Sequence, residues 1–126
     1  LVESDYSSSS YPTYNGWLNG AQFSEIAIGS NVTKLGNYAF CGCSSVTTIT
    51  MPENITFIGN SAFENCSSLE NFTIPEKLTS IGNNVFYNCS KLTSVVIPIT
   101  VTVIEEGVFE NCTNIKKITI SQNFLN

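Results

Sequence analysis

One stretch of sequence decides the fold. From Ile55 to Pro75 it reads Ile-Thr-Phe-Ile-Gly-Asn-Ser-Ala-Phe-Glu-Asn-Cys-Ser-Ser-Leu-Glu-Asn-Phe-Thr-Ile-Pro. Three of its residue types recur along the chain with one constant spacing of 23 residues and no insertion. These are Phe40, Phe63, Phe86 and Phe109; Cys43, Cys66, Cys89 and Cys112; and Pro52, Pro75 and Pro98. A constant period of this length predicts a solenoid, in which each repeat forms one coil and buries its apolar side against the next.

The repeat divides the chain into three parts. Residues 1–13 are Ser-rich and have no period, so they are interpreted as a flexible arm or linker. Residues 14–29 are interpreted as a degenerate first repeat or N-terminal cap, with Trp17 at the position of Phe40. Residues 30–126 form the repeat array, with copies at 32–52, 55–75, 78–98 and 101–121. The register would start another copy at Phe124, so we expect this end to be truncated or uncapped, and to self-associate unless further repeats follow.

Each copy changes its apolar pattern along its length, so each coil must change conformation. Alternating apolar and Thr residues predict a short strand before each repeat proline, and a β-branched segment at 32–35 and its copies predicts a second, shorter one. Stacked coils would place these strands in parallel sheets along the array. The five longer strands, those predicted before each repeat proline and at the equivalent positions, are 26–28, 49–51, 72–74, 95–97 and 118–120. Between the two strands, residues 37–43 are expected to form a single helical or 3-10 turn with Asn37 as N-cap.

The residue before each repeat Cys is Gly42, Asn65, Asn88 or Asn111. Gly and Asn adopt left-handed backbone most readily, so this position is expected to end the turn. Three of these residues also begin Asn-Cys-Ser/Thr sequons. The N-x-S/T sequons of the chain are Asn31, Asn54, Asn65, Asn71, Asn88 and Asn111.

The Phe and Cys series are predicted to be structural core. Stacking would align Phe40, Phe63, Phe86 and Phe109 in an aromatic column beside a ladder of Cys43, Cys66, Cys89 and Cys112. A zinc site needs convergent ligand pairs, whereas these thiols would lie one coil apart in a line, so we expect reduced, buried thiols. Cys41 has polar or bulky counterparts in the other copies and is therefore expected to be exposed.

Composition removes several classes of function. The chain has no His, so His-based acid–base or nucleophilic chemistry is excluded, and no catalytic residue, metal site or cofactor is predicted. The net charge is −5, with only five Lys and Arg, which argues against nucleic acid. No apolar run reaches the roughly 20 residues of a membrane span, so no membrane insertion is predicted for this fragment.

The unit Val-x-x-Ile-Gly-x-x-Ala-Phe-x-x-Cys-x-x-Leu-x-x-Ile-x-Ile-Pro resembles the 23-residue BspA-like (Treponema pallidum type) leucine-rich repeat. The resemblance covers the four copies between residues 32 and 121. It implies a β-rich leucine-rich-repeat solenoid wound as a right-handed superhelix. It also implies a surface protein that acts in adhesion. No binding residue transfers from the family, because the positions that face a ligand vary between repeats.

The outward positions of the predicted long strands are the candidate binding surface. Parallel stacking would present them as two columns of mostly small hydroxyl and amide side chains. The candidate residues are Glu25, Thr48, Thr50, Asn71, Thr73, Ser94, Val96, Lys117 and Thr119, with Ala27 completing the second column. The alternative is a solvated sheet face that carries β-branched residues for strand propensity.

The sequence therefore supports a non-enzymatic repeat module of a cell-surface or secreted protein. It would mediate adhesion or protein–protein binding to a host matrix protein, a host cell or another microbe, or bind a glycan. Two alternatives remain: an intracellular scaffold built from repeats, and an accessory binding module of a larger enzyme.

Overall fold

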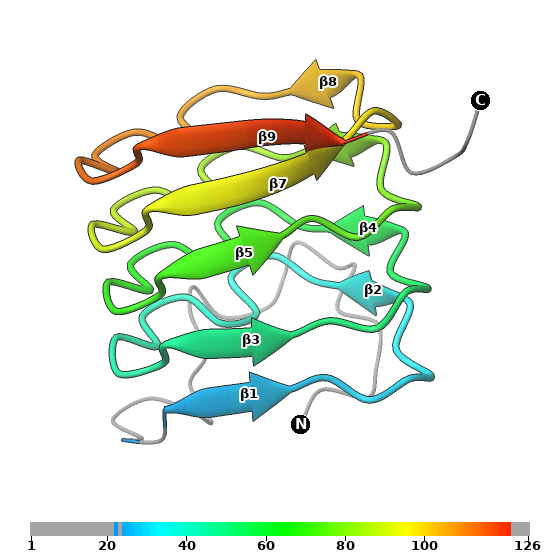
Figure 1. Cartoon of the computed structure of the whole chain (residues 1–126). Coiled ribbons are helices and arrows are strands. Elements are labelled where there is room, and N and C mark those ends of the chain that lie inside the picture. The colour runs from blue at the N-terminus through cyan, green and yellow to red at the C-terminus, as the bar shows by residue number, and fades with distance from the viewer. Residues whose placement is uncertain (1–21, 23, 122–126) are drawn as a thin grey trace.

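The computed structural model describes residue 22 and residues 24–121, and these residues form a β-solenoid (Figure 1). Five strands form its long-strand face: β1 (Glu25–Ala27), β3 (Thr48–Thr50), β5 (Asn71–Thr73), β7 (Ser94–Pro98) and β9 (Lys117–Ser121). Four two-residue strands form its short-strand face: β2 (Lys34–Leu35), β4 (Phe57–Ile58), β6 (Ser80–Ile81) and β8 (Val103–Ile104). Each long strand begins one residue earlier than predicted.

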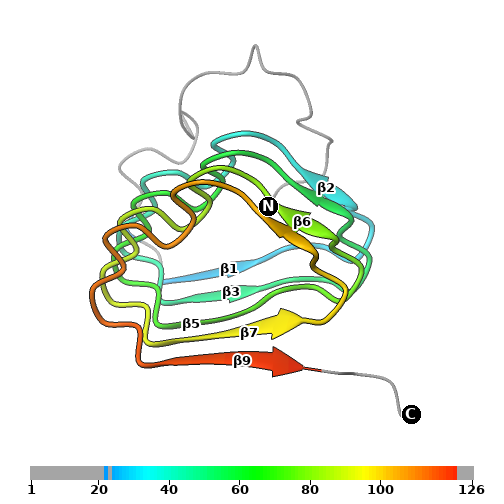
Figure 2. The same cartoon turned by 90° about the horizontal axis from the view of Figure 1, so that it is seen from above.

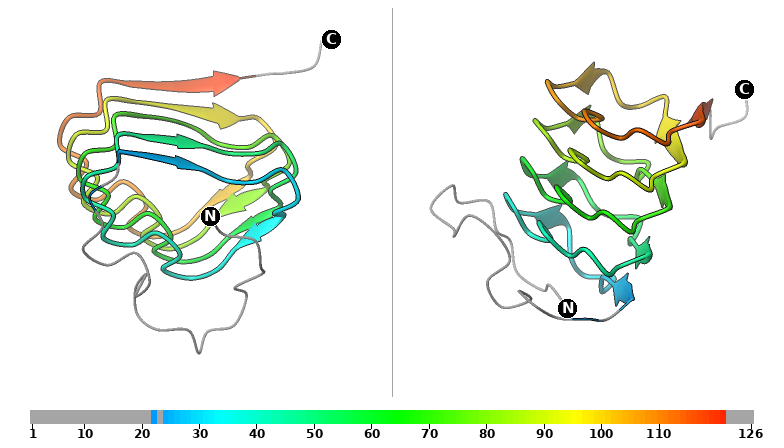
Figure 3. Two further views of the ribbon diagram at one scale, coloured as in Figure 1. Left: turned by 90° about the horizontal axis from the view of Figure 1, so that it is seen from below. Right: turned by 90° about the vertical axis from the view of Figure 1, so that its left-hand side faces the viewer.

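The coils rise from β1 to β9 and the two strand faces lie on opposite sides of the stack (Figures 2 and 3). Seen from above, the chain runs counter-clockwise as it rises toward the viewer, so the superhelix is right-handed, as predicted (Figure 2). Every strand pair is parallel, and each pair of partner residues is 23 positions apart in the sequence, for example Ile26 with Ile49 and Val95 with Ile118. The sequence period of 23 residues is therefore the length of chain in one coil.

Neither sheet is continuous, which corrects the prediction of sheets running the length of the array. On the long-strand face, β1 pairs with β3, and β5 pairs with β7 and β9, but β3 and β5 are not paired. The short-strand face breaks at the same level, between β4 and β6. The array therefore consists of two blocks of coils.

The turn side of the solenoid continues across this break. Backbone N–H groups of the turn donate to carbonyls one coil later at every level, as from Phe40 to Ala62, from Phe63 to Val85 and from Phe86 to Val108, at 2.8–3.1 Å. The two blocks are thus held together along the turns, while their sheets separate.

The predicted helical turn is wrong, because the described residues contain no helix. Residues 37–43 form successive turns, in which Cys41 N–H donates to Tyr38 and Cys43 N–H donates to Phe40. Tyr38 has a φ of 63°, and a left-handed residue at this point prevents helical continuation. The equivalent residues Ser61, Asn84 and Gly107 share this conformation. The predicted left-handed position before each Cys is confirmed, with φ between 63° and 82° at Gly42, Asn65, Asn88 and Asn111.

The Asn residues of the turn connect coils instead of capping helices. The Oδ1 of Asn37 accepts from the N–H of Asn60 at 2.8 Å, and the Oδ1 of Asn60 accepts from Asn83 at 2.9 Å. A side chain that bonds the same position of the next coil replaces the expected N-cap, since there is no helix N-terminus to satisfy.

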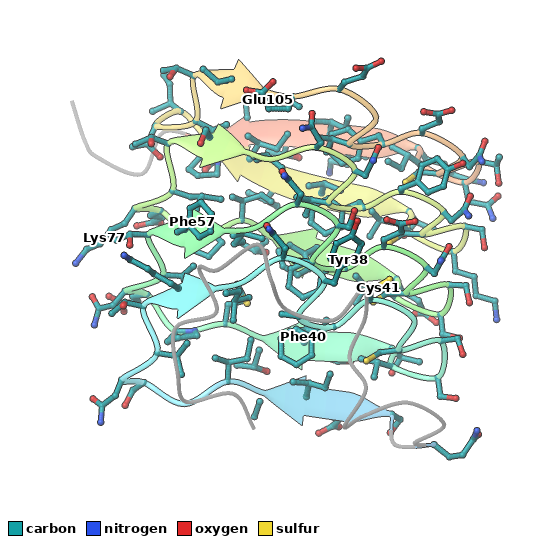
Figure 4. All side chains as sticks on the ribbon, turned by 180° about the vertical axis from the view of Figure 1, so that it is seen from behind. Tyr38, Phe40, Cys41, Phe57, Lys77 and Glu105 are labelled. Atoms are coloured by element: carbon teal, nitrogen blue, oxygen red, sulfur yellow. The ribbon has the colours of Figure 1, made fainter. Side chains whose placement is uncertain are left out.

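The core contains the predicted aromatic column. Phe40, Phe63 and Phe86 are fully buried, and neighbouring rings stack with centroids 5.8 Å apart. Phe109 stacks on Phe86 at the same distance but is only half-buried, because no described coil covers it. Phe40 lies inside the coil, whereas Phe57, on the short strand β4, points outward into solvent (Figure 4).

The repeat cysteines are free thiols within this core. The Sγ–H groups of the last three donate to a Phe carbonyl of the preceding coil, at 3.3 Å from Cys66 to Phe40, 3.2 Å from Cys89 to Phe63 and 3.0 Å from Cys112 to Phe86. Burial raises the pKa of Cys89 to about 12. These thiols are therefore packed and neutral at physiological pH, as predicted.

The prediction that Cys41 is exposed is wrong, since only 8% of the residue is accessible. Its pKa is raised to about 11, first by burial and then by the nearby carboxylate of Glu64, its counterpart one coil later. A Cys side chain is shorter than that of Glu64 or Tyr87 and does not reach beyond its neighbours into solvent. Cys41 lies at the turn side, below Tyr38 in Figure 4.

Candidate binding face

The long-strand face aligns the predicted binding residues in two columns. The registers pair Glu25 with Thr48, Asn71 with Ser94, and Ser94 with Lys117. The second column follows in the same way through Ala27, Thr50, Thr73, Val96 and Thr119. The break between β3 and β5 divides both columns into a lower and an upper group.

Most of these side chains are accessible, but the upper group is more closely packed. Ser94, Val96 and Thr119 are half-buried, whereas the other candidates are exposed. The Oγ of Ser94 donates to the Oδ1 of Asn71 at 2.8 Å, so one hydrogen bond links neighbouring strands across the face. The two columns offer hydroxyls, amides and methyl groups, and their charged residues, Glu25 and Lys117, lie at opposite ends.

A cavity of about 400 Å³ opens on this face at the break between β3 and β5. Its apolar lining comes from Ile49 and Met51 on one coil and Phe72 and Ile74 on the next. Asn71 and Thr73, two of the predicted binding residues, also line it, whereas Ser94 and Val96 do not. The repeat prolines and the acidic residues that follow them complete the wall.

Missing backbone bonds account for the opening. Ile28 N–H donates to Thr50 and Ile74 N–H donates to Val96, but among the described residues the equivalent bond from Met51 to Thr73 is absent. The bond from Glu70 N–H to Thr47 has lengthened to 3.5 Å, whereas its counterparts from Thr47, Thr93 and Lys116 measure 2.8–2.9 Å.

Phe72 provides a physical reason for the break. The central inward residue of the other long strands is aliphatic, while Phe72 places a ring against Phe63 at 5.1 Å and against Phe86 at 4.9 Å. Seating this larger side chain beside the aromatic column displaces β5 relative to β3, since a close-packed interior must accommodate the added volume.

Met51, Glu53 and Glu76 also line this cavity and were not predicted from the sequence as residues of the face. Two signals could have found them. The Pro-Glu pair occurs in the two copies on either side of the break, at Pro52-Glu53 and Pro75-Glu76, and not in the later copies. Phe72 departs from the aliphatic pattern of the other long strands.

The described structure has two further cavities, one of about 390 Å³ beside the turns at Asn65 and Asn88 and one of about 360 Å³ beside Asn84 and Glu106, and neither is lined by a predicted binding residue. No group of three or more His, Cys, Asp or Glu is placed to hold a metal within residues 24–121, and every buried side-chain N or O there is hydrogen-bonded. No helix in that part is long and apolar enough to cross a membrane. The N-terminal arm and most of the proposed cap, including Trp17, lie outside the described residues.

Three of the six sequon asparagines are hydrogen-bonded to one another. The side chains of Asn65, Asn88 and Asn111 form a ladder, in which the Nδ2 of each upper residue donates to the Oδ1 of the residue below at 2.8–2.9 Å. The ladder and the left-handed backbone give this position a structural role that does not depend on glycosylation.

Comparison with known proteins identifies the repeat. Residues 14–126 match the family model described as BspA type leucine-rich repeat region (6 copies). A solved leucine-rich repeat protein of T. pallidum is 33% identical with a TM-score of 0.72, over 75% of this chain and 44% of that one. None of the curated proteins gives a significant match.

A leucine-rich cell surface protein of Faecalibacterium prausnitzii is 26% identical with a TM-score of 0.72, over 96% of this chain and 36% of that one. A leucine-rich repeat protein of Eubacterium ventriosum is 29% identical with a TM-score of 0.58, over 79% of this chain and 32% of that one. The chain thus spans less than half the length of these structures. The repeat motif, the parallel coils and the family match agree, and the chain belongs to the BspA-type leucine-rich repeat family.

Proposed function

We propose that this chain is a non-enzymatic binding module of a cell-surface or secreted protein, and that it mediates adhesion through its long-strand face. The partner would be a protein, such as a host matrix or cell-surface protein, or a glycan. The observation that carries the proposal is the alignment of two columns of small polar side chains on one open face. One similar solved structure is a cell surface protein, which supports the proposed location.

Binding to a panel of immobilised matrix proteins tests this proposal. The variant Ser94→Arg/Val96→Arg adds bulk and charge to the centre of the upper group, and we expect it to abolish binding. The variant Thr56→Arg/Ser80→Arg adds the same charge at exposed positions on the short-strand side and serves as the matched control. Equal binding by both variants would refute the role of the long-strand face.

The edge formed by β8 and β9 is proposed as a surface for self-association. Its apolar side chains are open to solvent, with Ile118 47% and Ile120 62% exposed. Exposed apolar groups and unpaired strand edges together favour association. Sedimentation velocity should detect dimers that disappear in Ile118→Asp/Ile120→Asp. If the wild-type chain stays monomeric as its concentration is raised from about 1 to 100 μM, the proposal that this surface self-associates is refuted.

A further inference from the structure

The cavity between β3 and β5 has the chemistry of a subsite for a basic side chain. Its inner side is apolar and almost inaccessible to solvent, since Phe72 and Ile74 are 4% and 1% exposed. Met51 and Ile49 form a half-buried wall. At about 400 Å³ the cavity falls within the roughly 300–1,000 Å³ range of ligand pockets.

All the charge at this cavity is negative. Glu53 and Glu76 line it from successive coils, and no Lys or Arg does so. The nearest lysine in the sequence, Lys77, directs its Nζ to the Oδ1 of Asn54 at 2.9 Å, and within the described chain no ion pair neutralises either carboxylate. Pro52 and Pro75 precede these two residues and fix the backbone φ from which each carboxylate extends.

We propose that this cavity binds an arginine or lysine side chain of an extended segment of the protein partner. The aliphatic stem would lie on Ile49 and Met51, and the cationic head would lie between the carboxylates of Glu53 and Glu76. Long basic side chains bury their stems on apolar surface while the charged head stays hydrated. The inference rests on the proposed function, since it names the chemistry of a partner bound at the long-strand face.

The backbone at the break supports a peptide as the occupant. The N–H of Met51 has no acceptor in the described structure, although the same group of Ile28 and Ile74 bonds the next coil. An extended segment could supply a carbonyl to this N–H while its side chain enters the cavity. The positive charge of a basic segment also complements the chain as a whole, which carries a net charge of −5.

The chain offers a direct probe, because Met51 is its only methionine. Protein labelled with 13C at the methionine methyl group gives one resonance, from the wall of the cavity. We would titrate it with the peptide acetyl-Thr-Arg-Thr-amide, and with the same peptide carrying citrulline, which keeps the shape of arginine without its charge. We expect a saturable shift with the arginine peptide, and an affinity at least about tenfold weaker with citrulline.

The variant Glu53→Gln/Glu76→Gln should lower the affinity for the arginine peptide by about tenfold, since two partly exposed ion pairs are lost. Glu105→Gln/Glu106→Gln removes the same charge at exposed positions of another coil and should leave the affinity unchanged. Unaltered backbone spectra would show that each variant is folded, and Glu53→Gln alone replaces the double variant if that one is not.

No shift of the Met51 methyl group, or equal affinity for the arginine and citrulline peptides, would overturn the subsite. A loss as large in the Glu105/Glu106 variant would also overturn it, because the effect would then be long-range charge. These outcomes are separate from the test of the long-strand face. If Ser94→Arg/Val96→Arg abolishes binding to matrix proteins, the proposed function is supported whether or not the Met51 methyl resonance shifts with the peptide.

Discussion

Replacing Phe63 by Ala should destabilise the solenoid more than the same change at Phe109. Phe63 is fully buried and packs against Phe40, Phe86 and Phe72, with centroids at 5.8, 5.8 and 5.1 Å. Truncating a buried Phe costs about 3–5 kcal/mol, and three ring contacts place this residue at the upper end of that range. Phe109 is half-buried and stacks on one ring, so we expect about 2 kcal/mol there.

Urea unfolding followed by far-UV circular dichroism measures this difference. With a slope of about 1–3 kcal/mol per M, a gap of about 2–3 kcal/mol separates the two midpoints by about 0.7–3 M. If Phe63→Ala unfolds the chain outright, Phe63→Leu can be used instead, because it keeps most of the apolar volume. The urea midpoint of Phe63→Leu should still be lower than that of a matched Phe109→Leu. Equal losses at the two positions would refute the reasoning, because stability in a stacked array depends on the neighbours that each coil has.

Three further predictions concern the turn, the thiols and the break. Asn88→Ala should lower the free energy of unfolding about 1 kcal/mol more than Asn88→Gly, because both lose the ladder bond but only Ala is strained at a φ of 63°; equal urea midpoints would contradict this. Burial of Cys89 should contribute to stability by an amount that is constant below pH 9 and falls between pH 9 and 12 by up to about 1.4 kcal/mol per pH unit, since the pKa of Cys89 is raised from 9.0 to about 12 on folding and the unfolded thiol ionises first. Thermal melts measure the total fall, to which the raised pKa values of Cys41, Cys66 and Cys112 also contribute. Cys89→Ala should lessen the slope without removing it; a slope that the variant does not change would argue against Cys89 as a source. Phe72→Ile should let β3 and β5 pair and slow hydrogen exchange at the Met51 amide, whereas unchanged or faster exchange would show that the ring does not hold the strands apart.

What could be predicted from the sequence is what the repeat determines. The period of 23 residues predicted the stacked coils, the parallel register and the Phe and Cys core, because every coil must bury the same face against its neighbours. The left-handed position at Asn65, Asn88 and Asn111 was predictable as well, since few residue types adopt that conformation cheaply.

What could not be predicted depends on contacts between particular coils. The turn was mistaken for a helix because Tyr38 and Ser61 are not residues that usually adopt positive φ. The burial of Cys41 depends on the length of its neighbours, which a single position does not reveal. The break and its cavity follow from Phe72, whose effect on strand pairing appears only when its ring is packed beside Phe63 and Phe86.

Hydroxyl-radical footprinting of the complex with a captured matrix protein tests the central claim, binding through the long-strand face, most directly. The method labels side chains that are open to solvent, and each face carries reactive residues: Met51, Val96 and Lys117 on one side, Phe57 and Val103 on the other. We predict that the bound partner protects Met51, Val96 and Lys117 and leaves Phe57 and Val103 labelled as in the free chain. Protection of Phe57 and Val103 with unchanged labelling of Val96 and Lys117 would contradict the claim.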